Sequence, residues 1–210
     1  LRVDAFTVGI AAELQKARRT GLTFAPEAGT WRMRQVINKL ISEEDLYSAV
    51  ESAYSQGWRR VKLYFMTGLP TETDEDTLAI LELARKCIEV GRRHQPSPSV
   101  TVSVGGFVPK PFTPFQWFGQ NTEDELRRKV GLLRDELKRQ PKVYRGVQLK
   151  WHDARASVVE GMMSRGDRRL GRVIEDVWRA GGVFQEWGEH FDIRLWETAM
   201  ETHEIGRAHV

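Results

Sequence analysis

Cysteine is the residue that this 210-residue sequence most conspicuously lacks, since Cys87 is its single representative. One cysteine excludes a disulfide framework and a cysteine metal cluster built from this chain alone. No apolar run reaches the length of about 20 residues that a membrane-spanning helix needs, and no signal peptide opens the sequence. These absences predict a cytoplasmic protein with no membrane partner.

A strong excess of charge of one sign is missing as well. The chain carries 32 basic and 29 acidic residues, a net charge of +3, and its basic residues form only short groups. That balance gives no ground for nucleic-acid binding through charge alone. A chain that is 40% hydrophobic and 29% charged has an ordinary globular composition, and its length predicts one domain, or one and a fraction.

The most informative stretch is VKLYFMTGLPTETDED, residues 61–76. Its first six residues are mostly apolar and rich in strand formers, so they predict a short buried strand that ends before Gly68 and Pro70. Thr73 stands three residues before Asp76, the spacing of a capping box at a helix start. Strand, turn and helix start form a βα unit whose loop can hold a polar ligand.

Strand-like and helix-like segments alternate along the rest of the chain. Strands are predicted at residues 1–6, 22–26, 60–66 and 100–107, and helices at 8–18, 31–38, 42–55, 74–93 and 122–139. Ser42 stands three residues before Asp45, a spacing that predicts a capped start for the helix at 42–55. Strands separated by helices predict parallel βαβ units. A further strand-like segment at 147–151 and helical segments at 157–164 and 170–180 indicate a mostly helical C-terminal extension.

Each of the four predicted strands has one apolar face and one small or polar face. Lys62 and Tyr64, for example, alternate with the apolar residues of their strand, and Thr101 and Ser103 alternate with valines. An open doubly wound sheet is covered on both faces and should be apolar on both, whereas a barrel has one face on its helices and one on its lumen. The pattern therefore predicts an incompletely closed barrel that holds a polar ligand.

Two alternatives stay open for the polar face. One alternative is an edge strand with one solvated side, because alternation alone does not separate this case from a barrel. The other is a set of internal ion pairs, such as Lys62 with Glu27 or Asp4, since buried charges are normally paired.

Four segments carry a resemblance to a known family: FAPEAGTWRMRQVINK, KLYFMTGLPTETDED, FVPKPFTPFQW and RGDRRLGRVIEDVWRAGGVFQEW. Together they resemble the uncharacterised radical SAM family with an upstream cobalamin-binding-like domain, over residues 1 to about 202. The second segment is shared across the radical SAM superfamily, and the third and fourth are more specific. The resemblance implies an α/β fold, a partial (β/α)6 TIM-like barrel in which the predicted strands are the third to the sixth.

The resemblance also implies that the chain is a fragment. The family's CxxxCxxC loop, which holds a [4Fe-4S] cluster, follows the first barrel strand and would lie before Leu1. So would the glycine-rich segment that binds the SAM amino group. Cys87 falls on a helix after the fifth strand and is expected to be a packed thiol.

The expected function follows from that family. The full-length protein would be a radical SAM enzyme that receives an electron from a donor, reductively cleaves S-adenosylmethionine and uses the 5′-deoxyadenosyl radical on an unknown substrate, with RNA among the candidates. Cobalamin would be a further cofactor if its domain precedes the chain. The fragment alone is expected to be inactive. The alternative is a non-enzymatic RNA- or protein-binding α/β barrel.

The resemblance implies a SAM site at the ends of three strands. Glu27 would accept hydrogen bonds from the ribose hydroxyls or the ammonium group, and the backbone at Met66 and Gly68 would meet the adenine. Three residues after the next strand would wall the adenine: Phe107, Val108 and Pro109. The alternatives are an ion pair of Glu27 with Arg32 or Lys62, and plain core packing of the three wall residues.

One position departs from the family. The family has a histidine where Phe112 stands, in the loop at residues 110–117 that would lie over the barrel mouth. A polar group of the site is therefore missing from that loop.

The remaining sequence divides into an extension and a tail. Residues 1–140 are expected to form the C-terminal half of the barrel, and residues 141–203 an extension packed on it. Five aromatic residues of the extension predict a docking core rather than an RNA-stacking surface: Trp178, Phe184, Trp187, Phe191 and Trp196. Four polar residues are too scattered to predict a metal site: His152, Glu160, Asp167 and His190.

The last seven residues, 204–210, are expected to carry no biology. Residues 205–210, IGRAHV, can be encoded by the start of a common short-read sequencing adapter. We therefore expect this tail to be translated adapter.

Overall fold

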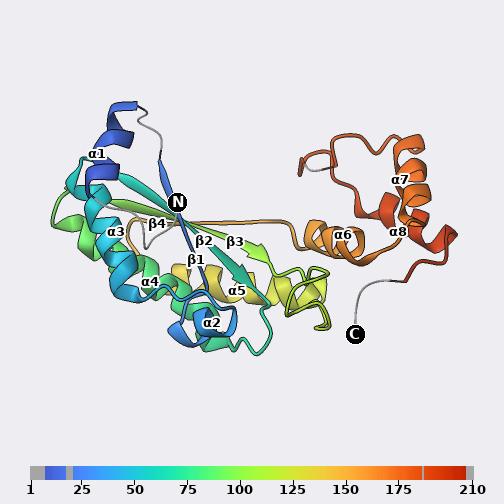
Figure 1. Cartoon of the computed structure of the whole chain (residues 1–210), viewed down its shortest axis with the longest axis horizontal. Helices are drawn as coiled ribbons and strands as arrows, with labels where there is room; N and C mark the ends of the chain where they lie inside the picture. The colour runs from blue at the N-terminus through green and yellow to red at the C-terminus, as the bar shows by residue number, and fades with distance from the viewer. Residues whose placement is uncertain (1–7, 18–20, 186, 207–210) are drawn as a thin grey trace. The chain divides into compact units, whose positions relative to one another are not determined.

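The computed structural model describes residues 8–17, 21–185 and 187–206 (Figure 1). Its strands are β1 (Leu22–Glu27), β2 (Arg60–Thr67), β3 (Ser99–Gly106) and β4 (Val147–Trp151). Its helices are α1 (Val8–Ala17), α2 (Trp31–Val36), α3 (Glu43–Ser55), α4 (Asp74–Arg92), α5 (Glu123–Arg139), α6 (Ala154–Arg165), α7 (Leu170–Arg179) and α8 (Ile193–Thr202). None of the described helices combines the length and the apolarity needed to cross a membrane.

The strands form one parallel sheet in the order β1-β2-β3-β4, alternating with helices along the chain. Leu22 lies opposite Val61 in the β1–β2 ladder, and Val100 lies opposite Val147 in the β3–β4 ladder. The predicted α/β class with a helical C-terminal region is thereby confirmed. The expected strand at residues 1–6 lies outside the described residues, and β4 extends the sheet beyond residue 140, where we expected the barrel part to end.

The helix starts follow the predicted capping signals. Thr73 and Asp76 form a capping box at α4, and Ser42 and Asp45 form another at α3. Each motif satisfies backbone N–H groups that the first helical turn leaves without partners, which typically stabilises a helix by about 1 kcal/mol. The local sequence therefore determines where each of the two helices starts.

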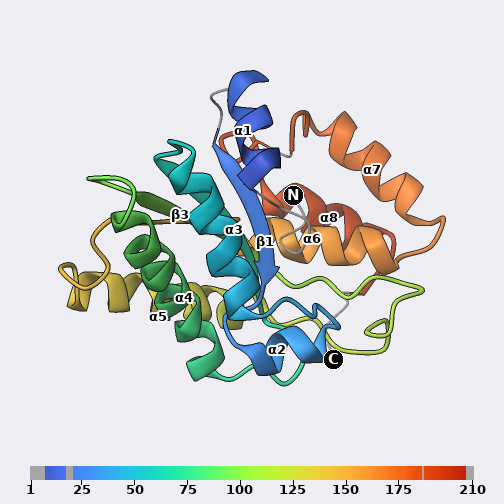
Figure 2. The ribbon, with the colours of Figure 1, turned by 60° about the vertical axis from the view of Figure 1, so that its left-hand side comes forward.

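One face of the sheet carries the core of the molecule. Val61, Leu63 and Phe65 of β2 are at most 2% exposed and pack with alternate residues of β1 and β3. Helices α3 and α4, which run side by side in Figure 2, and α5 supply the residues on the other side of this core. Lys62 and Tyr64 lie on the opposite face, as the alternation predicts.

The chain divides into two compact units. The first comprises the described residues up to Gly105 together with Arg128–Trp151, and it contains the helix-covered side of the sheet. The second comprises Gly106–Arg127 and the described residues from His152 onward. Its core joins α6, α7 and α8 through Val158, Val173, Val177 and Trp196.

The prediction that all five aromatic residues of the extension form a core is wrong. Trp196 is buried and Phe191 packs against the second core, but Trp178, Phe184 and Trp187 are 63%, 66% and 59% exposed. Helix α7 buries the face of Leu170, Val173 and Val177, so the next residue, Trp178, points away from it. At the C-terminal end Ile205 packs against the same core, whereas residues 207–210 lie outside the described part.

Candidate functional site

The candidate site lies at the carboxyl edge of the sheet in the first unit. Strands β1 and β2 are parallel neighbours, so the loops that follow Glu27 and Thr67 leave the sheet at the same edge. Glu27 lies opposite Phe65, after an irregularity in the ladder that begins at Phe24. Edges of this kind are where open α/β sheets bind their ligands.

Glu27 has a strained backbone and a carboxylate that water can reach. Its φ of 69° is in the left-handed region, which costs a non-glycine residue on the order of 1–3 kcal/mol and is concentrated at functional sites. Its side chain is 27% exposed and accepts a hydrogen bond of 3.3 Å from Lys39 Nζ. The predicted alternative ion pairs of Glu27 with Arg32 or Lys62 do not form.

A buried ion pair between Glu72 and Lys129 stabilises the turn after β2. Gly68 has a φ of 81°, and its N–H donates to Glu72 Oε2 at 2.7 Å. The same Oε2 lies 3.0 Å from Lys129 Nζ of α5, and the two side chains are 3% and 4% exposed. Burial raises the pKa of Glu72, against the opposing effect of the Gly68 N–H and Lys129. Because this N–H is already engaged, Gly68 can offer a ligand its Cα but not a free backbone donor.

Asp76 ties the loop after β1 to the start of α4. Thr30 Oγ1 donates to Asp76 Oδ1 at 2.6 Å, the Thr73 N–H donates to Oδ2 at 2.9 Å, and Arg32 pairs with Oδ2. Burial alone would raise the pKa of Asp76, but these hydrogen bonds outweigh it and hold the pKa at about 2. A Cβ on Gly29 would come within 2.6 Å of the Asp76 carbonyl oxygen, so glycine permits this close approach.

Sequence reasoning identified Asp76 only as a helix cap and missed its bonds to Thr30 and Arg32. Those partners are 46 and 44 residues away in the sequence, and no local spacing connects them. The bonds of Thr30 and Arg32 to Asp76 fix two loops of the carboxyl edge to one another, which gives the edge a defined shape.

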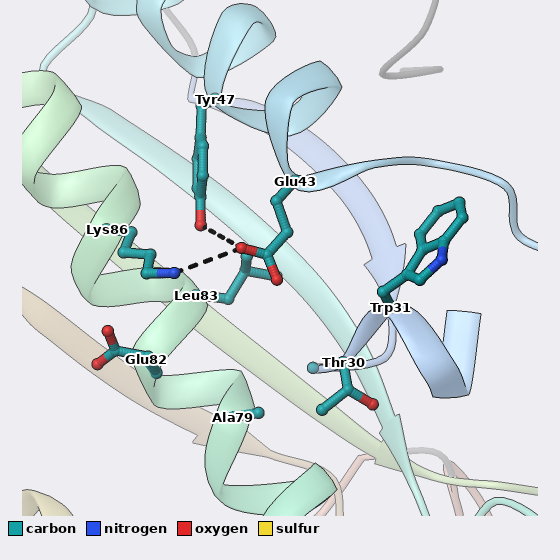
Figure 3. Close-up of a pocket in the computed structure, with 9 residues that line it drawn as sticks. Thr30, Trp31, Glu43, Tyr47, Ala79, Glu82, Leu83 and Lys86 are labelled. Atoms are coloured by element: carbon teal, nitrogen blue, oxygen red, sulfur yellow. Dashed lines mark hydrogen bonds and ion pairs between the residues drawn. The ribbon is translucent and has the colours of Figure 1, made fainter. Parts of the chain in front are cut away.

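A small pocket of about 110 Å³ lies beside this edge, among Thr30, Trp31 and the facing sides of α3 and α4 (Figure 3). Its centre is Glu43, whose Oε2 accepts from Tyr47 Oη at 3.0 Å and from Lys86 Nζ at 3.4 Å. The buried guanidinium of Arg34 lies 3.7 Å from the other carboxylate oxygen, and burial lowers the pKa of Arg34.

The pocket is best explained as a structural cluster. The cations Arg34 and Lys86 already neutralise the charge of Glu43, and the volume admits only a few water molecules. Sequence reasoning did not single out this cluster, because its residues come from α2, α3 and α4 and have no motif spacing.

The three predicted wall residues, Phe107, Val108 and Pro109, follow β3 and belong to the second unit. All are buried, and Phe107 packs edge-to-face on Phe115 with ring centroids 5.8 Å apart. In the same unit Phe112 has a φ of 60° and is 97% exposed. That placement is costly for an aromatic residue, so the backbone at Phe112 is strained.

The described residues do not fit an iron–sulfur cluster. No group of three or more His, Cys, Asp or Glu side chains gathers among them in a way that could hold a metal ion. Cys87 is fully buried in α4, and burial raises the pKa of its thiol, which disfavours the thiolate that iron requires. The prediction of a packed thiol is confirmed.

Comparison with known proteins finds a distant relative of the chain. The chain is 32% identical over 154 residues to the uncharacterized protein MJ0966 of Methanocaldococcus jannaschii, an alignment that covers 73% of this chain. The same alignment covers 32% of the length of that protein, so the chain spans about a third of it. No family model matches the chain.

Proposed function

We propose that the chain is the SAM-binding part of a radical SAM enzyme, whose full-length form reductively cleaves S-adenosylmethionine to produce a 5′-deoxyadenosyl radical. The observation that carries the proposal is the carboxyl edge of the sheet. There a water-accessible carboxylate in a strained backbone, Glu27, stands beside the glycine turn that Glu72 and Lys129 brace. Strain of this kind is kept where a precise side-chain direction is needed.

The residues of this edge have distinct roles in the proposal. Glu27 accepts hydrogen bonds from the ribose hydroxyls or the ammonium group of SAM, exchanging its contact with Lys39 for the ligand. Met66 and Gly68 present backbone to the adenine edge, and Asp76 keeps the two loops in register through Thr30. The wall of Phe107, Val108 and Pro109 stays a prediction of the family resemblance.

The cluster ligands are assigned to residues other than the described ones, since no donor set for iron gathers there. A [4Fe-4S] cluster, when bound, supplies the electron for SAM cleavage. The proposal also implies a cytoplasmic protein and an electron donor as partner, with cobalamin as a further cofactor if a domain for it is present.

The test uses the full-length gene product. We expect its sequence before the position of Leu1 to contain three cysteines at CxxxCxxC spacing, and the anaerobically purified protein to contain iron. Reduction with dithionite in the presence of SAM should then release 5′-deoxyadenosine, measured by chromatography. An iron-loaded protein that releases none, or a gene without the three cysteines, would overturn the proposal.

A second candidate function is a non-enzymatic binding module, favoured by the exposed aromatic residues Trp178, Phe184 and Trp187 of the second unit. Exposed aromatic side chains can stack on the bases of single-stranded RNA or dock a protein. Quenching of tryptophan fluorescence by single-stranded RNA, in a protein that lacks the upstream cysteines, would favour this candidate over the enzyme.

A further inference from the structure

The sheet face opposite α3 and α4 carries polar residues in two rows across the strands. The Ser99 N–H donates to the Arg59 carbonyl at 3.0 Å, which in a parallel ladder sets Arg60 opposite Ser99. Carried along both strands, this register puts Lys62 beside Thr101 and Tyr64 beside Ser103. The β3–β4 ladder adds Gln148 to the first row and Lys150 to the second.

Every polar side chain in these rows of β2, β3 and β4 can donate a hydrogen bond, and none is a carboxylate. Lys62 donates to the hydroxyl of Tyr64 at 2.7 Å, and its ammonium group lies 4.3 Å from the centre of the Tyr64 ring. Within the described residues neither Lys62 nor Lys150 has an acidic partner. The face therefore has two positive charges that the described part of the chain does not neutralise.

Two hydroxyl groups of β3, those of Thr101 and Ser103, stand between the lysines. Thr101 is 6% exposed and Ser103 is 3% exposed. In the part of the chain that the structure describes, neither side chain makes a hydrogen bond. Neither hydroxyl oxygen is among the fully enclosed polar atoms that lack a partner, so both groups can donate to a ligand with acceptor oxygens.

We propose that this face binds the phosphate group of the substrate, an inference that rests on the proposed function and names the substrate class. A phosphate has acceptor oxygens on every side, and lysine binds it as a point charge. Lys62 and Lys150 stand two strands apart, on the order of 10 Å between backbones, so both long side chains can reach one group centred over β3. SAM is assigned to the carboxyl edge, beyond these rows, and leaves them free for the second reactant.

The test titrates the 210-residue chain with inorganic phosphate and, separately, with acetate at constant ionic strength and pH 8. Binding is followed by backbone amide shifts in NMR spectra. We expect phosphate to shift the amides of Thr101, Ser103 and Lys150 in a saturable way, with an affinity at least threefold tighter than that of acetate.

Three variants locate the site. Lys62→Gln and Lys150→Gln should each weaken phosphate binding at least threefold, and Lys62→Arg should restore most of the affinity because it keeps the charge. Lys142→Gln is the matched control, since Lys142 is exposed and lies outside the sheet, and it should leave the affinity unchanged. Amide spectra without ligand check that each variant is folded.

Several outcomes would overturn the inference. They are the absence of saturable shifts, binding of acetate that is as tight as that of phosphate or tighter, and a loss of phosphate affinity in Lys142→Gln that equals the loss in Lys62→Gln and Lys150→Gln. Failure here is separable from failure of the proposed function, because release of 5′-deoxyadenosine from SAM by the full-length protein is measured without phosphate ligands.

Discussion

The two faces of the central sheet are built from alternate residues of the same strands, yet they differ in whether the described chain supplies partners for their side chains. On the covered face Leu63 is fully buried, and helices complete its contacts. On the other face Lys62 and Tyr64 find only one another as polar partners among the described residues. The covered face stabilises the fold, and the polar face carries the phosphate site that we propose. Substitutions of neighbouring residues can therefore separate stability from function.

The largest loss of stability is expected when the buried ion pair between Lys129 and Glu72 is broken. Lys129→Met would leave Glu72 buried without its partner, and breaking a buried pair in this way typically destabilises by about 3–5 kcal/mol. The pKa of Glu72, already raised, should rise further, so the variant should lose stability as pH rises.

Urea unfolding of this variant at pH 5 and pH 8 measures both effects. Lys142→Met serves as an exposed control. A loss that is the same at both pH values would mean that Glu72 is not the group left unpaired.

Leu63→Ala tests the covered face directly. The substitution removes a side chain that is fully buried between the sheet and its helices, and such truncations destabilise by about 2–5 kcal/mol. The midpoint of urea unfolding should fall accordingly with an unchanged slope. A shift equivalent to less than about 1 kcal/mol would show that this face is looser than its burial indicates.

Asp76→Asn tests the contact between the two edge loops. Because the pKa of Asp76 is about 2 in the folded protein and near 4 in an unfolded chain, its contribution of roughly 2 kcal/mol is present above pH 4 and is lost as pH falls toward 2. Wild type should therefore exceed the variant in unfolding free energy at pH 7 and approach it at pH 2.5. A constant difference across this range would contradict the assignment of the charge to Asp76.

The smallest effect on stability is expected one residue from Leu63. Lys62→Met removes a charge from the face opposite α3 and α4, where no acidic partner among the described residues is lost, so the unfolding free energy should change by less than about 0.5 kcal/mol. Thermal unfolding of Lys62→Met and of Leu63→Ala, each compared with wild type, measures this change in unfolding free energy. A loss comparable with that of the leucine variant would place Lys62 in the core.

The sequence allowed the fold to be predicted because its signals are local. The alternation of Val61, Leu63 and Phe65 with Lys62 and Tyr64 assigned both faces of β2, and two capping boxes placed the starts of α3 and α4. Helix α8 was missed, since the Asp192 side chain that caps it stands in an aromatic loop without a clear periodic pattern. The exposed position of Trp178 was missed because composition alone does not show which face of α7 is buried.

The candidate site was predicted less completely than the fold. Glu27 could be named from its place at a strand end, but its ion pair with Lys39 depends on a left-handed turn that no sequence pattern signals. The brace of Lys129 on Glu72 and the bond of Thr30 to Asp76 each join segments more than 40 residues apart. Such contacts depend on tertiary packing, and a single sequence does not display them.

The central claim is that the edge at Glu27 binds SAM, and equilibrium binding of SAM to the full-length protein tests it most directly. Glu27→Gln keeps the shape and removes the charge, so we predict binding weaker by about 1–3 kcal/mol, the usual value for a charge-assisted hydrogen bond, with iron content unchanged. Glu44→Gln, an exposed carboxylate at the start of α3, is the control and should bind SAM as wild type does. Wild-type affinity in Glu27→Gln would contradict the assignment, and loss of iron would mark Glu27 as a folding position instead.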